Sequence, residues 1–538
     1  MPARETAIGD RGMVASISPR AAAAGIRVLQ DGGNAFDAAI AVASMEWLTT
    51  PENCGLGGDT FAVLYDAKLD RLVAISGSGV SGTRATREAY ISQGLSGMPL
   101  DGWHAAAVMG TPDACATLNR QFGTRPLADL LAPALDVAER GVIVSAAMSG
   151  AIAATAAKLS LDDRAASIFL PGGSVPQTGD RLALPDLARS LRTLAQEGSE
   201  PFYTGAIAAE IVRASQEADG PFEAADFAGH TTDVGEPIST TYRGVEVYQT
   251  APPSQGLVTL EWLNLLEGDD LAALGFGSAE AIHLLAETKK LAFADRLRYA
   301  GDRRFVPDQV EALLSKQFAA ERRKAVDLKR ACPAPTAGSL PEQGGDTSYF
   351  AVADGEGNAI SFIHSMSAWF GCGVAAGDTG ILLNNRAGRG FYLDPPDHVN
   401  VIAPGKKTMH TLNCYMLCRD GRPWIVGGTP GGDRQVQWNV QAITNIIDHE
   451  MSIGEVVEAP AWISWPGSDP AEIHAPFELQ LEGRFDGTVA TALEARGHSV
   501  VKVGDYGLGS RHQFILLDEA GILHGATDPR VPGVALGI

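Results

Sequence analysis

The sequence is short of positive charge and of long apolar runs. Its 42 Lys and Arg residues stand against 64 Asp and Glu residues, which gives a net charge of −22 over 538 residues. Such a chain repels polyanions, so we expect neither nucleic acid nor an anionic membrane as a partner. No apolar stretch reaches the roughly 18 residues that a membrane-spanning helix needs. The first residues lack the charged head and apolar run of a secretory signal, so we expect a cytoplasmic protein.

Cysteine is also scarce. The six cysteines are scattered and form no CxxC pair, which argues against a disulfide framework and against a zinc site. The glycine-rich loop at 53–60 lacks the Lys-Ser/Thr ending of a phosphate-binding loop and leads into a strand-like run, so close backbone packing explains it better. We therefore expect no metal and no organic cofactor.

Apolar residues are plentiful, at 45% of the chain, and they suffice for a large core. Residues 19–31 predict an alanine-rich helix with proline near its start and two glycines beyond its end. A second helix, expected at 35–48, is apolar on most sides, which predicts burial against a sheet. Between about 112 and 330 the pattern is mainly helical. Residues 332–346 are rich in Pro, Gly and polar residues, as is typical of an exposed, flexible tether.

The rest of the chain is organised around the stretch that follows this tether. From Thr347 to Asp354 small and aromatic residues alternate, a Gly/Asn turn follows, and a second apolar run begins at Ala359, which is typical of a β-hairpin. Taken alone, Thr347 is most simply a structural strand residue. Cleavage of the Asp346–Thr347 bond would change its chemistry, because the freed α-amino group, with a reference pKa of about 8, could take the hydroxyl proton.

A second group of motifs lies downstream of the hairpin. An apolar run at 380–383 predicts a buried strand, and Arg386 and Arg389 follow it. Further on, two strands expected at 412–418 and 423–427 lead to Gly431-Gly432, just before a helix expected from about 435 to 450. Two adjacent glycine N–H groups at a helix N-terminus can stabilise an oxyanion, since no side chain blocks the approach. The glycine pair alone is also compatible with an ordinary loop.

Eight motifs in this order resemble the gamma-glutamyltransferase family of N-terminal-nucleophile hydrolases, over nearly the whole chain. The motifs are Gly32 to Ala39, Pro252 to Gly256, Leu291 to Arg296, Thr347 in its Gly-Asp-Thr-Ser context, the turn at 354–359, Gly380 to Asn385, Thr429 to Gly432 and Asp528 to Arg530. The resemblance implies an α+β fold, a four-layer αββα sandwich with additional helices from the large-subunit segment. It also implies autocatalytic cleavage between Asp346 and Thr347.

Cleavage there would give a large-subunit segment, 1–346, which ends in the tether at 332–346, and a small-subunit segment, 347–538. The resemblance implies that both chains of one precursor stay together, and the sequence is compatible with a homodimer. It further implies that Thr347 is the nucleophile and its own amine the general base. Ser365 would orient the nucleophile, and Gly431 and Gly432 would form the oxyanion hole.

The substrate-binding positions depart from the family pattern. The region 75–79 has no arginine where the large chain of the transferases binds the glutamyl α-carboxylate, and His410-Thr411 replaces a Ser-Ser pair. Arg389 stands where an acidic residue normally holds the α-amino group. An arginine at that place repels an ammonium by roughly 1 kcal/mol or more at close range. We therefore expect γ-glutamyl donors to bind badly.

Five residues are candidates for substrate binding: Arg386, Arg389, His410, Thr411 and Asn413. A guanidinium fork matches a carboxylate bidentately, and the segments around these residues resemble the oxamate amidohydrolase branch of the family. This resemblance implies a small anionic amide, such as oxamate, as the substrate. The alternative is that both arginines are surface or ion-paired residues.

Three functions follow for the chain. The first is an amidohydrolase for an oxamate-type amide that works through an acyl-enzyme intermediate. The second is a γ-glutamyl hydrolase or transferase, or an acylase for another amide. The third is a non-catalytic binding member of the family, against which the intact Thr347, Ser365 and glycine pair argue.

Overall fold

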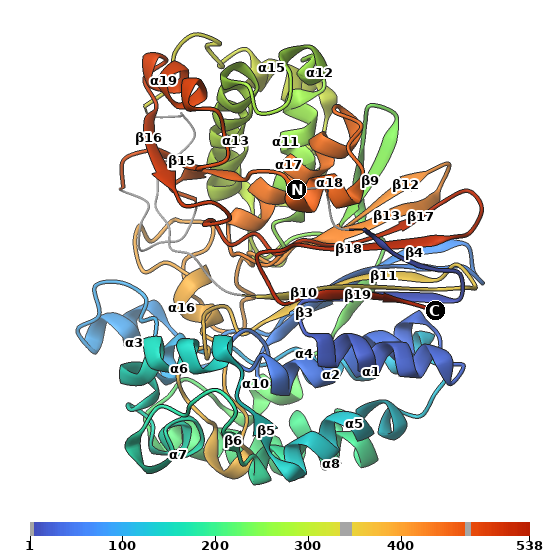
Figure 1. Ribbon diagram of the computed structural model, residues 1–538. Helices are drawn as coiled ribbons and strands as arrows, with labels where there is room; N and C mark the ends of the chain where they lie inside the picture. Colours follow the sequence, from blue (N-terminus) through green and yellow to red (C-terminus); the bar gives the residue numbers. More distant parts are fainter. Residues whose placement is uncertain (1–4, 334–346, 468–474) are drawn as a thin grey trace.

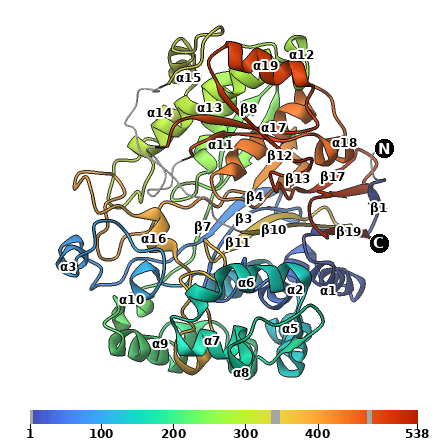
Figure 2. The same cartoon turned by 60° about the vertical axis from the view of Figure 1, so that its left-hand side comes forward.

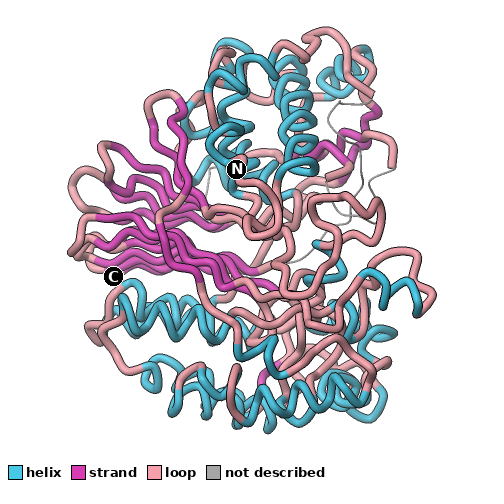
Figure 3. The backbone as a smooth tube through the Cα atoms, turned by 180° about the vertical axis from the view of Figure 1, so that it is seen from behind, coloured by secondary structure: helices cyan, strands magenta, loops and turns pink. Residues whose placement is uncertain are grey.

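The structure is a computed structural model that describes residues 5–333, 347–467 and 475–538. Within these ranges, two seven-stranded antiparallel sheets lie face to face, with helices covering the outer face of each (Figure 1). Figure 3 shows both sheets from behind, between the two helical layers. The four-layer αββα sandwich expected from the sequence is confirmed. The boundary at 346/347 and the tether before it lie outside the described residues, except for residues 332 and 333.

The sheet that contains the predicted hairpin is buried on both faces. Its hairpin strands pair with Ser348 opposite His364 and Ala353 opposite Ala359, as expected for a short Gly/Asn turn. Every residue of the two hairpin strands is buried, because helices cover one face and the second sheet covers the other. The strand order is β19 (Val534–Gly537), β2 (Gly12–Ser16), β10 (Ser348–Asp354), β11 (Ala359–Ser365), β3 (Asp59–Asp66), β4 (Arg71–Gly77) and β7 (Asp233–Gly235).

The second sheet contains a hairpin that the sequence pattern hid. Residues 242–248 suggest a single strand, but Arg243 and Gly244 have φ values of 52° and 82° and form a two-residue turn. Positive φ at both positions suits the right-handed twist of the two strands. The strand order is β1 (Ala7–Gly9), β18 (Leu523–Thr527), β17 (Gln513–Leu517), β13 (Arg422–Gly428), β12 (Tyr415–Arg419), β9 (Val245–Gln249) and β8 (Ile238–Tyr242).

Residues 380–383 do not form the regular strand that their apolar run suggested. They are buried, but they make only isolated bridges, Leu382 with Ala375 and Leu383 with Gly57. The run ends at the short helix α16 (Arg386–Gly390). Burial rather than a strand ladder therefore accounts for their apolar character.

The helical layer against the hairpin sheet begins with α1 (Pro19–Gln30) and α2 (Ala35–Thr49), close to their predicted limits. Asn34 and Asp37 cap α2 reciprocally, and the helix is buried on all sides because more helices pack behind it (Figure 2). The other helices of this half are α3 (Arg87–Ser92), α4 (Thr111–Phe122), α5 (Leu127–Arg140), α6 (Ala146–Leu159), α7 (Asp163–Phe169), α8 (Pro185–Glu197), α9 (Ala206–Glu217) and α10 (Ala224–Ala228).

The other helical layer covers the second sheet. The helix after the glycine pair, α17 (Arg434–Ile447), lies close to its predicted range. No helix within the described ranges is both long and apolar enough to cross a membrane. The helices are α11 (Gly256–Leu266), α12 (Leu271–Leu274), α13 (Ala279–Tyr299), α14 (Val310–Leu313), α15 (Lys316–Arg323), α17 (Arg434–Ile447), α18 (Ile453–Glu458) and α19 (Gly487–Ala495). Small sheets are formed by β14 (Trp462–Trp465), β15 (Glu478–Glu482) and β16 (Ser499–Val503), and by β5 (Val142–Ile143) and β6 (Arg181–Leu182).

Candidate active site

Thr347 lies directly before β10 and is 1% exposed. Its Oγ1 donates a hydrogen bond to Ser365 Oγ at 3.3 Å, and Gln435 Nε2 donates to Thr347 Oγ1 at 3.2 Å. Ser365 ends β11, the partner strand of the hairpin. The hairpin therefore brings together the two hydroxyls that the sequence analysis paired. Asp346, the other half of the predicted cleavage site, lies outside the described residues.

Gln435 is a site residue that the sequence analysis missed. It lies in the first turn of α17, and its Oε1 accepts hydrogen bonds from Asn413 N at 3.1 Å and Asn413 Nδ2 at 3.3 Å. Asn439, one turn further along α17, donates to Asn413 Oδ1 at 2.7 Å. Asn413, a predicted substrate ligand, thus contacts the residue that contacts Thr347. The available signal was the position of Gln435, three residues after the glycine pair at a helix start.

The glycine pair before α17 adopts a turn that requires glycine. Gly431 and Gly432 have φ values of 139° and 60°, in the range that L side chains rarely adopt. A Cβ at Gly431 would also lie 2.5 Å from the Trp438 ring. The carbonyl groups of the pair accept from Arg434 N and Gln435 N, both at 3.1 Å. The turn is thereby joined to the helix that carries Gln435.

Arg386 is 2% exposed and forms an ion pair with Asp59, with Nε and Oδ2 3.3 Å apart. Burial raises the pKa of Asp59 to about 6 although Arg386 opposes that shift, and burial lowers the pKa of Arg386 to about 10 against the attraction of Asp59. Both shifts show that desolvation outweighs the attraction within the pair. The ion-paired alternative considered for this arginine therefore describes its contacts.

His410 completes this buried cluster, with its Nε2 2.6 Å from Ser78 Oγ and its Nδ1 3.9 Å from Asp59 Oδ2. Burial, and then the charge of Arg386, holds the pKa of His410 well below its ordinary value, so the ring is neutral at pH 7. Arg386 Nη2 and His410 Nδ1 have no hydrogen-bond partner among the described residues. Buried polar atoms are nearly always paired, so a water molecule or a ligand group would satisfy these two atoms.

Arg389 lies one turn along α16 from Arg386 and is half-buried. Its Nη1 donates to the carbonyl oxygen of Ser367 at 2.9 Å, and Ser367 N donates to Ser365 Oγ at 2.7 Å. Two contacts therefore link this guanidinium to the hydroxyl that faces Thr347. Thr411 is also half-buried, and its carbonyl oxygen accepts a hydrogen bond from Gln255 Nε2.

A second buried polar cluster lies directly behind the start of the hairpin. Glu46 of α2 accepts from Ser348 Oγ at 2.5 Å, from Ser16 Oγ at 2.6 Å and from His364 Nε2 at 2.8 Å. Trp47 Nε1 donates to His364 Nδ1 at 3.3 Å, so His364 accepts through Nδ1 and donates to Glu46 through Nε2. Ser348 follows Thr347 and His364 precedes Ser365, so one carboxylate holds both strands that carry the paired hydroxyls.

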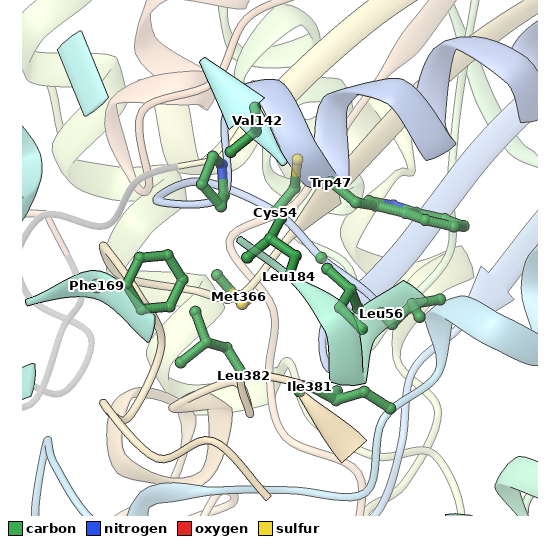
Figure 4. Close-up of a pocket in the computed structure, with 13 residues that line it drawn as sticks. Trp47, Cys54, Leu56, Val142, Phe169, Leu184, Met366, Ile381 and Leu382 are labelled. Carbon is green, nitrogen blue, oxygen red and sulfur yellow. The ribbon is translucent and has the colours of Figure 1, made fainter. Parts of the chain in front are cut away.

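Two cavities differ sharply in size and lining. The cavity of Figure 4 measures about 30 Å³ and is enclosed by apolar side chains such as Phe169, Leu184 and Leu382, with Cys54 and Met366 at its wall. That volume suits about one water molecule. Burial raises the pKa of the Cys54 thiol well above its ordinary value, so the cavity wall carries no thiolate at neutral pH.

The larger cavity, of about 500 Å³, opens at Gly431. Its wall includes Lys158, Trp369, Arg434 and Trp438. A volume of this size is typical of sites for small organic molecules. It provides the space beside the glycine turn that an amide substrate would need.

Comparison with known proteins agrees with this geometry. A family model described as gamma-glutamyltranspeptidase matches residues 21–538. The chain belongs to the gamma-glutamyltranspeptidase family. This confirms the family expected from the sequence and, with it, a hydrolase that acts on amide bonds.

Three known proteins are similar to this chain over almost its whole length. The glutathione hydrolase-like YwrD proenzyme of Bacillus subtilis (strain 168) is 39% identical over 99% of this chain and 100% of its own length. The oxamate amidohydrolase proenzyme of Klebsiella pneumoniae is 33% identical over 98% of this chain and 99% of its own. The crystal structure of cephalosporin acylase from Bacillus halodurans has a TM-score of 0.90 and 34% identity, over 99% of this chain and 97% of that chain. These identities do not single out the oxamate branch.

Two further motifs of the gamma-glutamyltranspeptidase family meet at the glycine turn. Gln255 Nε2 donates to the carbonyl oxygen of Gly432 at 3.2 Å, and Gln255 Oε1 accepts from Arg296 Nη1 at 2.9 Å. Arg296 also forms a buried ion pair with Asp433. Residues from α13 and from the start of α11 thus hold the turn in place, which accounts for motifs that the sequence left without a role.

Proposed function

We propose that the chain is a self-processing amidohydrolase with an N-terminal threonine nucleophile. Cleavage between Asp346 and Thr347 would give the large segment 1–346 and the small segment 347–538. The substrate would be a small anionic amide, such as oxamate. The observation that carries this proposal is the Thr347 hydroxyl, which lies between Ser365 and Gln435 at the head of a buried strand.

The proposed reaction begins with the α-amino group that cleavage frees on Thr347. This amine takes the hydroxyl proton while Oγ1 attacks the amide carbon, and the N–H groups of Gly431 and Gly432 stabilise the oxyanion. The C–N bond then breaks, and the leaving nitrogen takes the proton back from the Thr347 ammonium. Water attacks the resulting ester with the amine as base and releases the acid. Gln435 Nε2, already a donor to Oγ1, stabilises the negative charge that returns to this oxygen.

The acyl anion is assigned to the arginines of α16. Arg389 is tied to Ser367, two residues from Ser365, and Arg386 has a buried Nη2 without a partner among the described residues. A carboxylate between these guanidinium groups would satisfy that donor. The neutral His410 would add a polar edge to the same pocket, with Thr411 near it.

A second candidate function is an acylase with a larger substrate. The cavity of about 500 Å³ at Gly431 favours it, since oxamate consists of only a handful of atoms. The similarity to cephalosporin acylase, with a TM-score of 0.90, also supports an acylase. A γ-glutamyl substrate is less favoured, because positions 75–79 lack an arginine and Arg389 would face its ammonium.

The Thr347→Ala variant tests the proposed nucleophile. We expect this variant to remain a single chain of 56.3 kDa and to be inactive, whereas Thr347→Ser should still be cleaved. A denaturing gel, mass spectrometry of the new N-terminus, and ammonia release from oxamate measure these outcomes. Two bands for Thr347→Ala would refute the assignment. Rapid turnover of a chromogenic γ-glutamyl anilide, without ammonia release from oxamate, would refute the acyl specificity.

A further inference from the structure

The described lining of the larger cavity is positively charged, although the chain as a whole is negatively charged. The chain as a whole carries −22, yet among the described residues that line this cavity three are cationic, Lys158, Arg434 and Arg511, and none is acidic. A concave surface lined by one sign of charge concentrates ligands of the opposite sign. The described lining of this cavity therefore favours an anionic ligand.

Arg434 is the cation closest in sequence to the proposed oxyanion turn. Its backbone N–H donates to Gly431 O at 3.1 Å, which ties the residue to that turn. Its Nε is buried and has no hydrogen-bond partner among the described residues. Its guanidinium forms no ion pair with a described carboxylate and lies 5.8 Å from the centre of the Trp465 ring. Arg386 differs in this respect, because it forms an ion pair with Asp59.

Lys158 supplies a second, more tightly held charge. Its Nζ donates to the carbonyl oxygens of Trp369 and Gly371, both at 3.1 Å, and lies 3.3 Å from the carboxylate of Asp101. These contacts hold the loop that carries Trp369 against α6. We assign Lys158 mainly to shaping the cavity and Arg434 to binding the anion.

Two indole rings give the cavity a flat apolar wall. Trp369 is half-buried, and Trp438 is 2% exposed with an Nε1 that has no hydrogen-bond partner among the described residues. Aromatic walls bind flat apolar groups by stacking or edge contacts, and a guanidinium beside them binds a carboxylate. The combination suits an anion that is carried on a ring.

We propose that this cavity binds the amine half of a substituted amide, and that this half is an apolar, ring-containing amine that bears a carboxylate. Oxamate, whose amine half is ammonia, would leave the cavity empty. The inference rests on the proposed function, in which Arg386 and Arg389 hold the acyl half. Neither of these arginines lines the cavity, so the amine half takes the space beyond the scissile bond. When the C–N bond breaks, the nitrogen takes a proton from the Thr347 ammonium and the free amine leaves through the cavity.

Binding of two product amines to the self-processed protein tests the charge requirement. The probes are 4-aminobenzoate and its neutral counterpart 4-methylaniline, with dissociation constants from ligand-observed NMR titration. We expect 4-aminobenzoate to bind at least tenfold more tightly. In Arg434→Gln the preference should fall below threefold, and Arg434→Lys should retain part of it. Arg419→Gln, at the exposed β12–β13 turn, is the matched control for loss of one positive charge and should keep the full preference.

Equal binding of the two amines, or an unchanged preference in Arg434→Gln, would overturn the inference. A kinetic comparison separates it from the proposed function, using the N-oxalyl amides of the same two amines. Hydrolysis of both with equal kcat/KM also counts against the cavity. Hydrolysis of neither, with the binding preference intact in a protein cleaved before Thr347, supports the cavity and shows that the acyl half was assigned wrongly.

Discussion

Two buried polar clusters flank the start of the hairpin, and they differ in how completely their atoms are paired. In the Glu46 cluster both carboxylate oxygens and both His364 nitrogens have hydrogen-bond partners. In the Asp59 cluster, Arg386 Nη2 and His410 Nδ1 have none among the described residues. A fully paired buried network stabilises one arrangement, whereas unpaired buried atoms mark a place where another group binds. The first cluster therefore holds the hairpin, and the second leaves two buried atoms that the proposed ligand could satisfy.

The pKa values of Asp59 and Arg386 show a second property of the Asp59 cluster. In the second cluster the pKa of Asp59 is raised to about 6 and that of Arg386 is lowered to about 10, so burial disfavours both charges. The rise in the pKa of Asp59 from 3.8 to about 6 corresponds to roughly 3 kcal/mol. A pair that costs stability is retained most readily where its charges serve the chemistry.

Removal of the Glu46 carboxylate should have the largest effect on stability. In Glu46→Ala the donors Ser16, Ser348 and His364 lose their shared acceptor, and we expect the free energy of unfolding to fall by about 3–5 kcal/mol. Urea denaturation in the Thr347→Ala background measures this on a single chain. Glu197→Ala, on the exposed end of α8, is the control and should change stability by less than about 0.5 kcal/mol. A loss below about 1 kcal/mol for Glu46→Ala would contradict a structural role for the cluster.

The Asp59 cluster should show a pH dependence of the opposite sign to an ordinary paired carboxylate. Because the pKa of Asp59 is higher in the folded chain than its ordinary 3.8, the folded state holds the proton longer. Its contribution to the free energy of unfolding therefore decreases as pH rises from about 4 to about 6 and is constant above. The total decrease should be up to roughly 3 kcal/mol.

Asp59→Asn isolates that contribution, since the amide keeps an acceptor near Arg386 but cannot ionise. The difference in unfolding free energy between the parent and Asp59→Asn, both in the Thr347→Ala background, should follow this pH curve. In the active background, Asp59→Asn should lower kcat/KM more than tenfold while costing less stability at pH 7 than Glu46→Ala. A pH-independent difference would show that Asp59 is not shifted in the way described.

Of the substitutions at Glu46, Asp59 and Arg389, Arg389→Lys should change the measured free energies least. The lysine keeps the charge but loses the planar fork, so we expect kcat/KM for an anionic amide to fall about tenfold, corresponding to about 1.4 kcal/mol of transition-state binding. Arg389→Met should lose more, because the charge itself is removed. If Arg389→Met were as active as the parent enzyme, Arg389 would not bind the carboxylate of the acyl half, and Arg386 alone would be assigned to it.

Much of the architecture was accessible from sequence patterns. The limits of α1 and α2 follow from terminal Pro and Gly residues and from apolar composition, and the 348–365 hairpin follows from alternation around a Gly/Asn turn. The hairpin at 238–249 was missed because Arg243-Gly244 lies inside a run that otherwise alternates like one strand. The strand expected at 380–383 was wrong because an apolar run reports burial, and here burial comes from loop packing without a ladder.

Some features of the candidate site could likewise be predicted from the sequence, and others could not. The sequence, through its resemblance to the family, implied that Thr347 and Ser365 act together, and the register of the hairpin places the two residues side by side. The sequence also determined that two glycines would precede a helix. Gln435, Glu46 and the ion pair of Arg386 with Asp59 were decided only by the tertiary structure, since each depends on contacts between segments far apart in sequence. Local patterns carry information about strands and turns, but the partner of a buried polar group depends on how the layers pack.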